Sequence, residues 1–223
     1  AGAAPAADVE ALLKHRLLPL CPSLLADEDP IPLYTLKLLG GALESSGSLI
    51  PAAVDLGLAP RFFEFLSLEH TNNNVHNVRL CLQVAACAEV PDATLAALEP
   101  GAKVADVLIY AFENSVEPFM EPALGLCCAL LRRAVHRREG VPVGALTAAT
   151  VVFLEVSTAQ DANLAELGAE CYALLVRACP EATAAETLAV PGPARVAAVL
   201  EQLASDLAED AVGGAGPDGT AAV

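Results

Sequence analysis

The residues that most often do chemistry in proteins are scattered in this sequence. Its four histidines never form an H-x-x-x-H or H-E-x-x-H pair. A zinc site on a helix needs such spacing, because two imidazoles one turn apart can reach the same ion. We therefore predict no metal site at His15, His70, His76 or His136, and for His76 a surface or capping role.

The cysteines also argue against a metal or a disulfide framework. There are seven, an odd number, and no C-x-x-C pair occurs. Most lie in apolar helical patterns, which is typical of buried free thiols in a reducing compartment. We expect a cytoplasmic protein with unpaired thiols at Cys21, Cys81, Cys87, Cys127, Cys128, Cys171 and Cys179.

No catalytic or cofactor-binding motif is present. The acidic run Asp27 to Asp29 precedes Pro30, where carboxylates complement the amino terminus of a helix. It lacks the further oxygen ligands and the glycine turn of a calcium loop. The sequence contains no G-x-S-x-G, phosphate-binding or dinucleotide-binding motif. The sequence predicts no catalytic residue and no cofactor.

A basic cluster over residues 132–138 stands out in this acidic chain. One interpretation is structural, because cations at the end of a long helix interact favourably with its dipole and its last carbonyls. The other is docking onto an acidic protein surface through guanidinium–carboxylate pairs. Both remain open for Arg132, Arg133, Arg137 and Arg138.

A second candidate binding set consists of amides. Asn73, Asn74, Asn77 and Gln83 lie at the start and along the expected helix from residue 74. An amide side chain can donate to and accept from the backbone of an extended partner. The alternative is a helix cap followed by a solvated face.

Composition indicates an all-α fold. Hydrophobic residues make up 55% of the 223, yet only 4% are aromatic and none is tryptophan. Leu, Ala and Val must therefore form the core, and Leu and Ala are strong helix formers. Apolar stretches are interrupted before they reach about 18 residues, so we expect no membrane span.

The formal net charge of −16 excludes some partners. Nucleic acids and anionic membranes are bound mainly through Lys and Arg, so we predict that neither is a partner. The charge fits either a soluble surface or attraction to a basic protein, and it does not separate the two.

A unit of three helices can be read between residues 48 and 90. A short helix over 48–56 ends at Gly57, where we expect the left-handed conformation that glycine tolerates best. A medium helix follows over 58–68, with Pro60 in its first turn. After a polar turn, a long helix is predicted over 74–89.

The same unit recurs along the chain. Long helices are predicted to start near residues 30, 74, 117 and 161, within the roughly 40–47-residue period of armadillo and HEAT repeats. We predict an all-α, armadillo/HEAT-like right-handed α-solenoid of about four to five repeats, spanning 8–210. Residues 1–7 and the Gly-rich tail 211–223 are expected to be flexible. The other predicted helices cover 9–20, 102–114, 143–157, 181–189 and 193–209.

The stretch from Gly57 to Glu89 resembles an armadillo repeat. A narrower resemblance lies in Glu28 to Leu39 followed by Val54 to Leu58, which are similar to the carboxy-terminal repeat region of Fused-type serine/threonine kinases and their pseudokinase relatives. That family is associated with cilia, motile axonemes and Hedgehog-type signalling. No kinase motif occurs here, so the resemblance assigns no kinase residue.

These features predict a non-catalytic protein–protein interaction scaffold that is part of a larger ciliary, axonemal or signalling protein. The resemblance implies axonemal or microtubule-associated protein partners, a larger complex, and a location in the cytoplasm or the axoneme. The alternative is the regulatory helical region of a Fused-type kinase whose catalytic domain lies outside this chain.

Overall fold

The computed structural model describes residues 6–68, 75–114, 117–133, 147, 150 and 162–189, and every regular element in this part is helical. The predicted all-α fold is confirmed. The helices are α1 (Ala6–Leu12), η1 (Leu13–Leu17), η2 (Leu18–Leu20), α2 (Cys21–Leu24), α3 (Ile31–Ser45), α4 (Leu49–Asp55), α5 (Leu58–Glu64), α6 (Val75–Ala86), α7 (Asp92–Ala96), α8 (Pro100–Glu113), α9 (Glu117–Arg132), α11 (Ala162–Ala178) and α12 (Pro180–Ala189).

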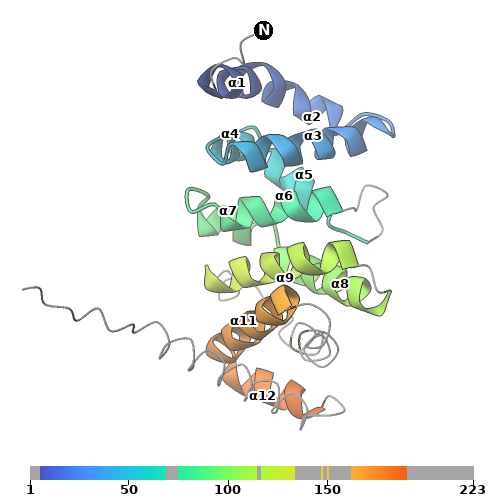
Figure 1. The fold of residues 1–223 in the computed structure, drawn as a ribbon, viewed down its shortest axis with the longest axis vertical. Helices are drawn as coiled ribbons and strands as arrows, with labels where there is room; N and C mark the ends of the chain where they lie inside the picture. Colours follow the sequence, from blue (N-terminus) through green and yellow to red (C-terminus); the bar gives the residue numbers. More distant parts are fainter. Residues whose placement is uncertain are drawn as a thin grey trace, which may run out of the picture.

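Four long helices form the spine of the molecule. In Figure 1 they lie one below another, and α3 packs on α6, α6 on α9, and α9 on α11. Their first residues follow one another at intervals of about 44 residues, which is the armadillo/HEAT period. The predicted starts near 30, 74, 117 and 161 are confirmed to within a residue or so.

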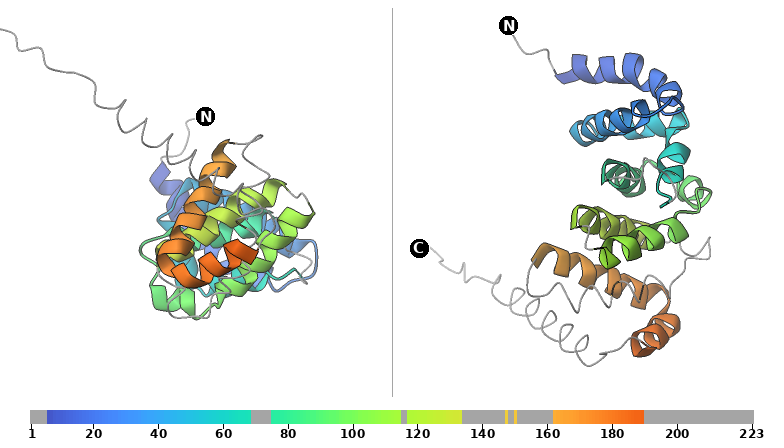
Figure 2. Two further views of the ribbon diagram at one scale, coloured as in Figure 1. Left: turned by 90° about the horizontal axis from the view of Figure 1, so that it is seen from below. Right: turned by 90° about the vertical axis from the view of Figure 1, so that its right-hand side faces the viewer.

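The other helices form a second layer beside this spine. Helix α5 packs on α6, α8 on α9, and α12 on α11. The right-hand view of Figure 2 shows the long helices on one side of the stack and α5, α7 and α12 on the other. In that view α6 is set back relative to α3 and α11, so the side of the long helices is the concave one. A solenoid of this kind offers its concave side as an extended surface.

The first helical segment is longer and less regular than predicted. The sequence predicts one helix over 9–20, whereas helical backbone runs from Ala6 to Leu24 and passes through a π-helical and a 3₁₀ turn. Pro19 and Pro22 explain the irregularity, because proline has no N–H to donate to the carbonyl four residues earlier.

Gly57 separates α4 from α5 as predicted. Its φ is 74°, in the left-handed region, and its N–H donates to the carbonyl of Val54 at 2.9 Å. The next residue begins α5, which ends at Glu64 instead of continuing to residue 68. The glycine therefore allows two helices to meet at a sharp angle with almost no intervening loop.

The core is one continuous cluster that extends from Leu18 to Leu175. Phe62 and Phe63 are its largest fully buried side chains, and most other members are Leu, Val, Ala or Cys. Small and straight side chains let the helices approach closely. Gly125 of α9 illustrates this, because a β-carbon there would lie 3.2 Å from the side chain of Leu82 on α6.

Some predicted boundaries differ from the structure. Helix α6 ends at Ala86, three residues before the predicted end, and the five-residue α7 was not predicted. Pro91 precedes α7 in extended conformation and thereby interrupts the helical path. The helices predicted over 143–157 and 193–209 lie outside the described residues, apart from the isolated positions 147 and 150. No helix in the described part has the length and hydropathy needed to cross a bilayer.

Candidate functional site

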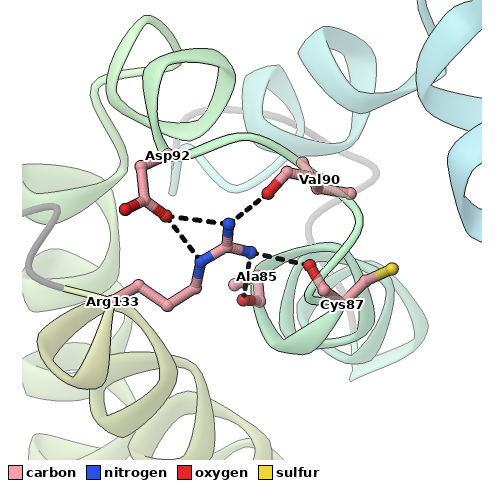
Figure 3. A network of polar contacts seen from close by, with 5 residues as sticks. All are labelled: Ala85, Cys87, Val90, Asp92 and Arg133. Carbon is pink, nitrogen blue, oxygen red and sulfur yellow. Dashed lines mark hydrogen bonds and ion pairs between the residues drawn. The ribbon is translucent and has the colours of Figure 1, made fainter.

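The most extensive polar contact in the described chain centres on Arg133, directly after α9. Its Nε donates to Oδ1 of Asp92 at 2.8 Å, and Nη1 donates to the carbonyls of Cys87 at 2.7 Å and Ala85 at 3.2 Å. Nη2 contacts Asp92 at 2.8 Å and the carbonyl of Val90 (Figure 3). Four hydrogen bonds and one ion-pair contact thus engage all three nitrogens of the guanidinium.

This contact joins the neighbouring helices α6 and α7 to the end of α9, at least 41 residues further along the chain. The carbonyls of Ala85 and Cys87 lie at the carboxyl end of α6, where helical carbonyls lack partners within the helix. Asp92 opens α7, and the arginine comes from the end of α9. The side chain of Arg133 is only 17% exposed. The structural interpretation of the basic cluster therefore describes Arg133 best, although it caps α6 and not its own helix.

Arg132 makes a different contact. Its Nε donates to Oε1 of Glu170 on α11 at 2.9 Å, and Nη2 contacts the same oxygen. The two side chains are 54% and 39% exposed, so solvent screens the pair. The structure therefore leaves Arg132 on the surface, where it could also meet a partner. Arg137 and Arg138, the other members of the predicted set, lie outside the described residues.

The structure places the two described amides in or near the core. Asn77 is fully buried, and Oε1 of Gln83 is buried without a hydrogen-bond partner in the described part of the chain. Asn73 and Asn74 lie outside that part. Asn77 therefore does not lie on an open surface, and a binding role for the amide set stays a prediction.

Three thiols gather where α9 meets α11. Sγ of Cys171 donates to Sγ of Cys127 at 3.2 Å, Sγ of Cys128 donates to the carbonyl of Leu167 at 3.8 Å, and Thr150 donates to Cys171 at 3.6 Å. The hydrogen bond with Cys127, together with burial, raises the pKa of Cys171 well above its usual value.

Two further buried thiols behave in the same way. Hydrogen bonding with Cys171, and then burial, raises the pKa of Cys128, while burial raises that of Cys21 to about 11. Because the thiolate is the reactive form, these groups suit packing and not nucleophilic chemistry. No group of three His, Cys, Asp or Glu side chains that could hold a metal occurs among the described residues.

An exposed surface that sequence reasoning missed lies across α3 and α6. We call Tyr34, Lys37, Leu38, His76 and Arg79 the α3–α6 face. Tyr34 is 65% and Leu38 51% exposed, Lys37 and Arg79 are exposed, and His76 is half-buried.

The two cations of this face occupy equivalent positions in their helices. Lys37 and Arg79 lie 42 residues apart, and in each helix the residues at −2, −1, +2, +5 and +6 from the cation are buried. The two cations therefore point from the same face of two helices that pack on each other. Only the burial pattern makes this register visible.

Comparisons with known proteins agree with this fold. Residues 58–145 match a family described as the RUNKEL ARM-repeat domain, and residues 4–51 match HEAT repeats of the family described as serine/threonine-protein kinase ULK4-like. Serine/threonine-protein kinase RUNKEL of Arabidopsis thaliana is 34% identical over 134 residues, or 60% of this chain and 10% of that protein. The chain thus spans about a tenth of the length of the curated relative it matches.

A solved structure supports the same architecture. The crystal structure of an engineered protein is similar with a TM-score of 0.59 over 91% of this chain and 85% of that chain, at 16% sequence identity. This likeness shows the fold alone. Together, the matches confirm the predicted armadillo/HEAT-like repeat and its resemblance to the repeat regions of Fused-type kinases.

Proposed function

We propose that this chain is a non-catalytic protein–protein interaction scaffold. The observation that carries the proposal is the unbroken succession of contacts α3–α6–α9–α11, which places four long helices side by side on the concave side of the stack. Such a surface is longer than any single helix pair offers, and it suits an elongated protein partner. The inference rests on architecture, since helical-repeat folds bind proteins far more often than they catalyse reactions.

The polar groups of the described residues support a binding role over a catalytic one. The arginine with the most contacts binds backbone carbonyls and an aspartate of its own chain. The thiols of Cys21, Cys128 and Cys171 have raised pKa values and are protonated at neutral pH. These groups stabilise the stack, and none is arranged as a nucleophile beside a base.

The relatives suggest the context in which the scaffold works. Both matched families take their names from kinases, and the chain corresponds to a small part of RUNKEL. We propose that the chain is the helical-repeat region of a larger kinase-type protein in the cytoplasm. More specifically, we propose that this protein works in the cilium or axoneme and that its partner is an axonemal or microtubule-associated protein.

The match to a kinase also favours a second candidate, in which these repeats regulate a catalytic domain outside this chain. The two candidates differ in the partner. A scaffold binds a separate protein, whereas a regulatory region binds the kinase domain of its own polypeptide and changes its activity.

Crosslinking in ciliated cells tests the proposal. The chain, and a helical-repeat protein of the same fold but unrelated sequence, are expressed as bait, crosslinked and analysed by mass spectrometry. We expect one protein or complex to be enriched over the control, with crosslinks on the long-helix side. Crosslinks to a kinase domain would select the regulatory candidate, and equal recovery by both baits would contradict both functions.

A further inference from the structure

The charge of the concave side is divided along the stack. In a chain with a net charge of −16, the charged residues of α3 and α6 are Lys37, Glu44 and Arg79, so these two helices carry more positive than negative charge. Helices α9 and α11 carry more glutamate than arginine. Helices α3 and α6 together therefore carry one net positive charge, opposite in sign to α9 and α11 and to the whole molecule.

The two cations are not used to hold the fold together. Neither Lys37 nor Arg79 forms a salt bridge with another described residue, whereas Arg61, Arg132 and Arg133 all do. Both side chains are exposed and occupy equivalent positions of two packed helices, so an extended anionic ligand can contact both. Their shared register makes them a two-point site for negative charge.

Exposed apolar groups accompany these cations. Tyr34 lies about one turn before Lys37 on α3, and Leu38 follows it. Both side chains are more than half exposed, so two large apolar groups reach solvent on the same helix face as Lys37. A ligand for this face must therefore offer apolar as well as anionic groups.

We infer that the α3–α6 face binds an acidic protein segment that also carries apolar side chains, with Lys37 and Arg79 contacting its carboxylates and Tyr34 and Leu38 its apolar residues. The inference rests on the proposed scaffold function and names the chemistry of the partner. A nucleic acid fits less well, because the rest of the chain would repel a polyanion and two cations supply little phosphate neutralisation.

The small number of lysines permits a direct test. The chain has three, at Lys14, Lys37 and Lys103, and Nζ of Lys103 contacts the carbonyl of Leu98. The probe is a fluorescent 14-residue peptide in which Asp and Glu alternate with Leu and Phe. A carbodiimide joins its carboxylates directly to nearby lysines. We expect the peptide crosslink on Lys37, and binding that weakens as salt concentration increases.

Two double variants with the same net charge separate local from global electrostatics. Lys37→Glu with Arg79→Glu should weaken peptide binding at least tenfold in fluorescence anisotropy. The matched control is Lys14→Glu with Arg61→Glu, which reverses two exposed cations on other helices. It should change the affinity less than threefold. Circular dichroism confirms that both variants fold.

Several results would overturn the inference. These are equal weakening in both double variants, crosslinks mainly on Lys14 or Lys103, or equal binding of a peptide with Lys in place of every acidic residue. An RNA oligonucleotide that competes as well as the acidic peptide would also overturn it. If cellular partners bind the Lys37/Arg79 variant normally, this inference fails while the scaffold function stands.

Discussion

Arg133 shows how one side chain can fix the relation between repeats. Replacing it by Ala would leave the carbonyls of Ala85, Cys87 and Val90 without this donor and would remove the partner of Asp92. We expect Arg133→Ala to lower the free energy of unfolding by about 2–4 kcal/mol, because partly buried hydrogen bonds to a charged group are worth more than neutral ones.

Urea denaturation of two further variants checks the cause. Arg133→Lys keeps the charge but cannot reproduce the planar set of five donors, so it should recover less than half of the loss. Arg132→Ala removes an exposed pair and should cost under about 1 kcal/mol. Equal losses in Arg132→Ala and Arg133→Ala would contradict this description.

Glu10 provides a prediction about pH. Oγ of Ser48 donates to its Oε1 at 2.6 Å, and this bond, with a contribution from Ser46, holds the pKa of Glu10 below its ordinary value of 4.5. Because the pKa of Glu10 is lower in the folded protein than in the unfolded chain, the bond stabilises the fold at pH values above the pKa of the unfolded chain. That contribution is lost as pH falls below about 4.5 and through the folded-state pKa.

Carbon-13 NMR titration of the Glu10 carboxyl measures this effect. In Ser48→Ala the pKa should rise toward its ordinary value, and the stability of the variant should differ less from the wild type at pH 3 than at pH 7. Ser45→Ala is the control, because its hydroxyl bonds a carbonyl within its own helix. An unchanged Glu10 titration in Ser48→Ala would show that the hydroxyl does not set the pKa.

At the scale of the helix, the glycines divide into two classes. A β-carbon at Gly40 or Gly41 in the middle of α3 would meet nothing within 4 Å, so close packing does not explain this pair. Gly57 has a positive φ that other residues adopt only with strain.

Alanine substitutions separate these classes. We expect Gly41→Ala to stabilise the protein by about 0.5–1 kcal/mol through helix propensity. Gly57→Ala should destabilise it by about 1–2 kcal/mol. Thermal denaturation by circular dichroism provides the measurement, and a destabilised Gly41→Ala would mean that α3 needs its glycine pair for another reason, such as bending.

The helices were largely predictable from the sequence, whereas their contacts were not. Apolar spacing and the glycine turn located α3, α4, α6, α9 and α11, since these signals are local. Helix α7 was not predicted, because five residues after a proline are too few to show a helical period of apolar residues. The end of α6 was missed by three residues, which is typical for boundaries where propensity changes gradually.

The candidate site required the structure because its parts are far apart in the chain. The sequence identified Arg133 within a basic cluster, but its partners lie 41 to 48 residues away. Asn77 was expected on an exposed face, either for a partner or for solvent, yet the packing of α6 between α3 and α9 buries it. Lys37 and Arg79 gave no sequence motif, because their relation depends on two helices packing in register.

At the scale of the whole molecule, α9 is the helix on which the stack depends most. It packs against α6, α8 and α11, and Leu124 in its middle is fully buried. We expect Leu124→Ala to destabilise the protein by about 2–5 kcal/mol, as large-to-small core substitutions do. Because each repeat of a solenoid is stabilised by its neighbours, hydrogen exchange should accelerate in α6 and α11 as well as in α9.

Leu188 on α12 is the matched control, since its side chain is 75% exposed. Leu188→Ala should change the stability by no more than about 0.5 kcal/mol. Faster exchange restricted to α9 in Leu124→Ala would mean that the repeats unfold independently.

The Arg133 contact also has a mechanical consequence. Rotation of α9 relative to α6 or α7 would break several hydrogen bonds of one guanidinium together, so this joint resists torsion. A load that twists the stack would therefore meet concentrated resistance at the junction of α6, α7 and α9, where one guanidinium must release several partners at once.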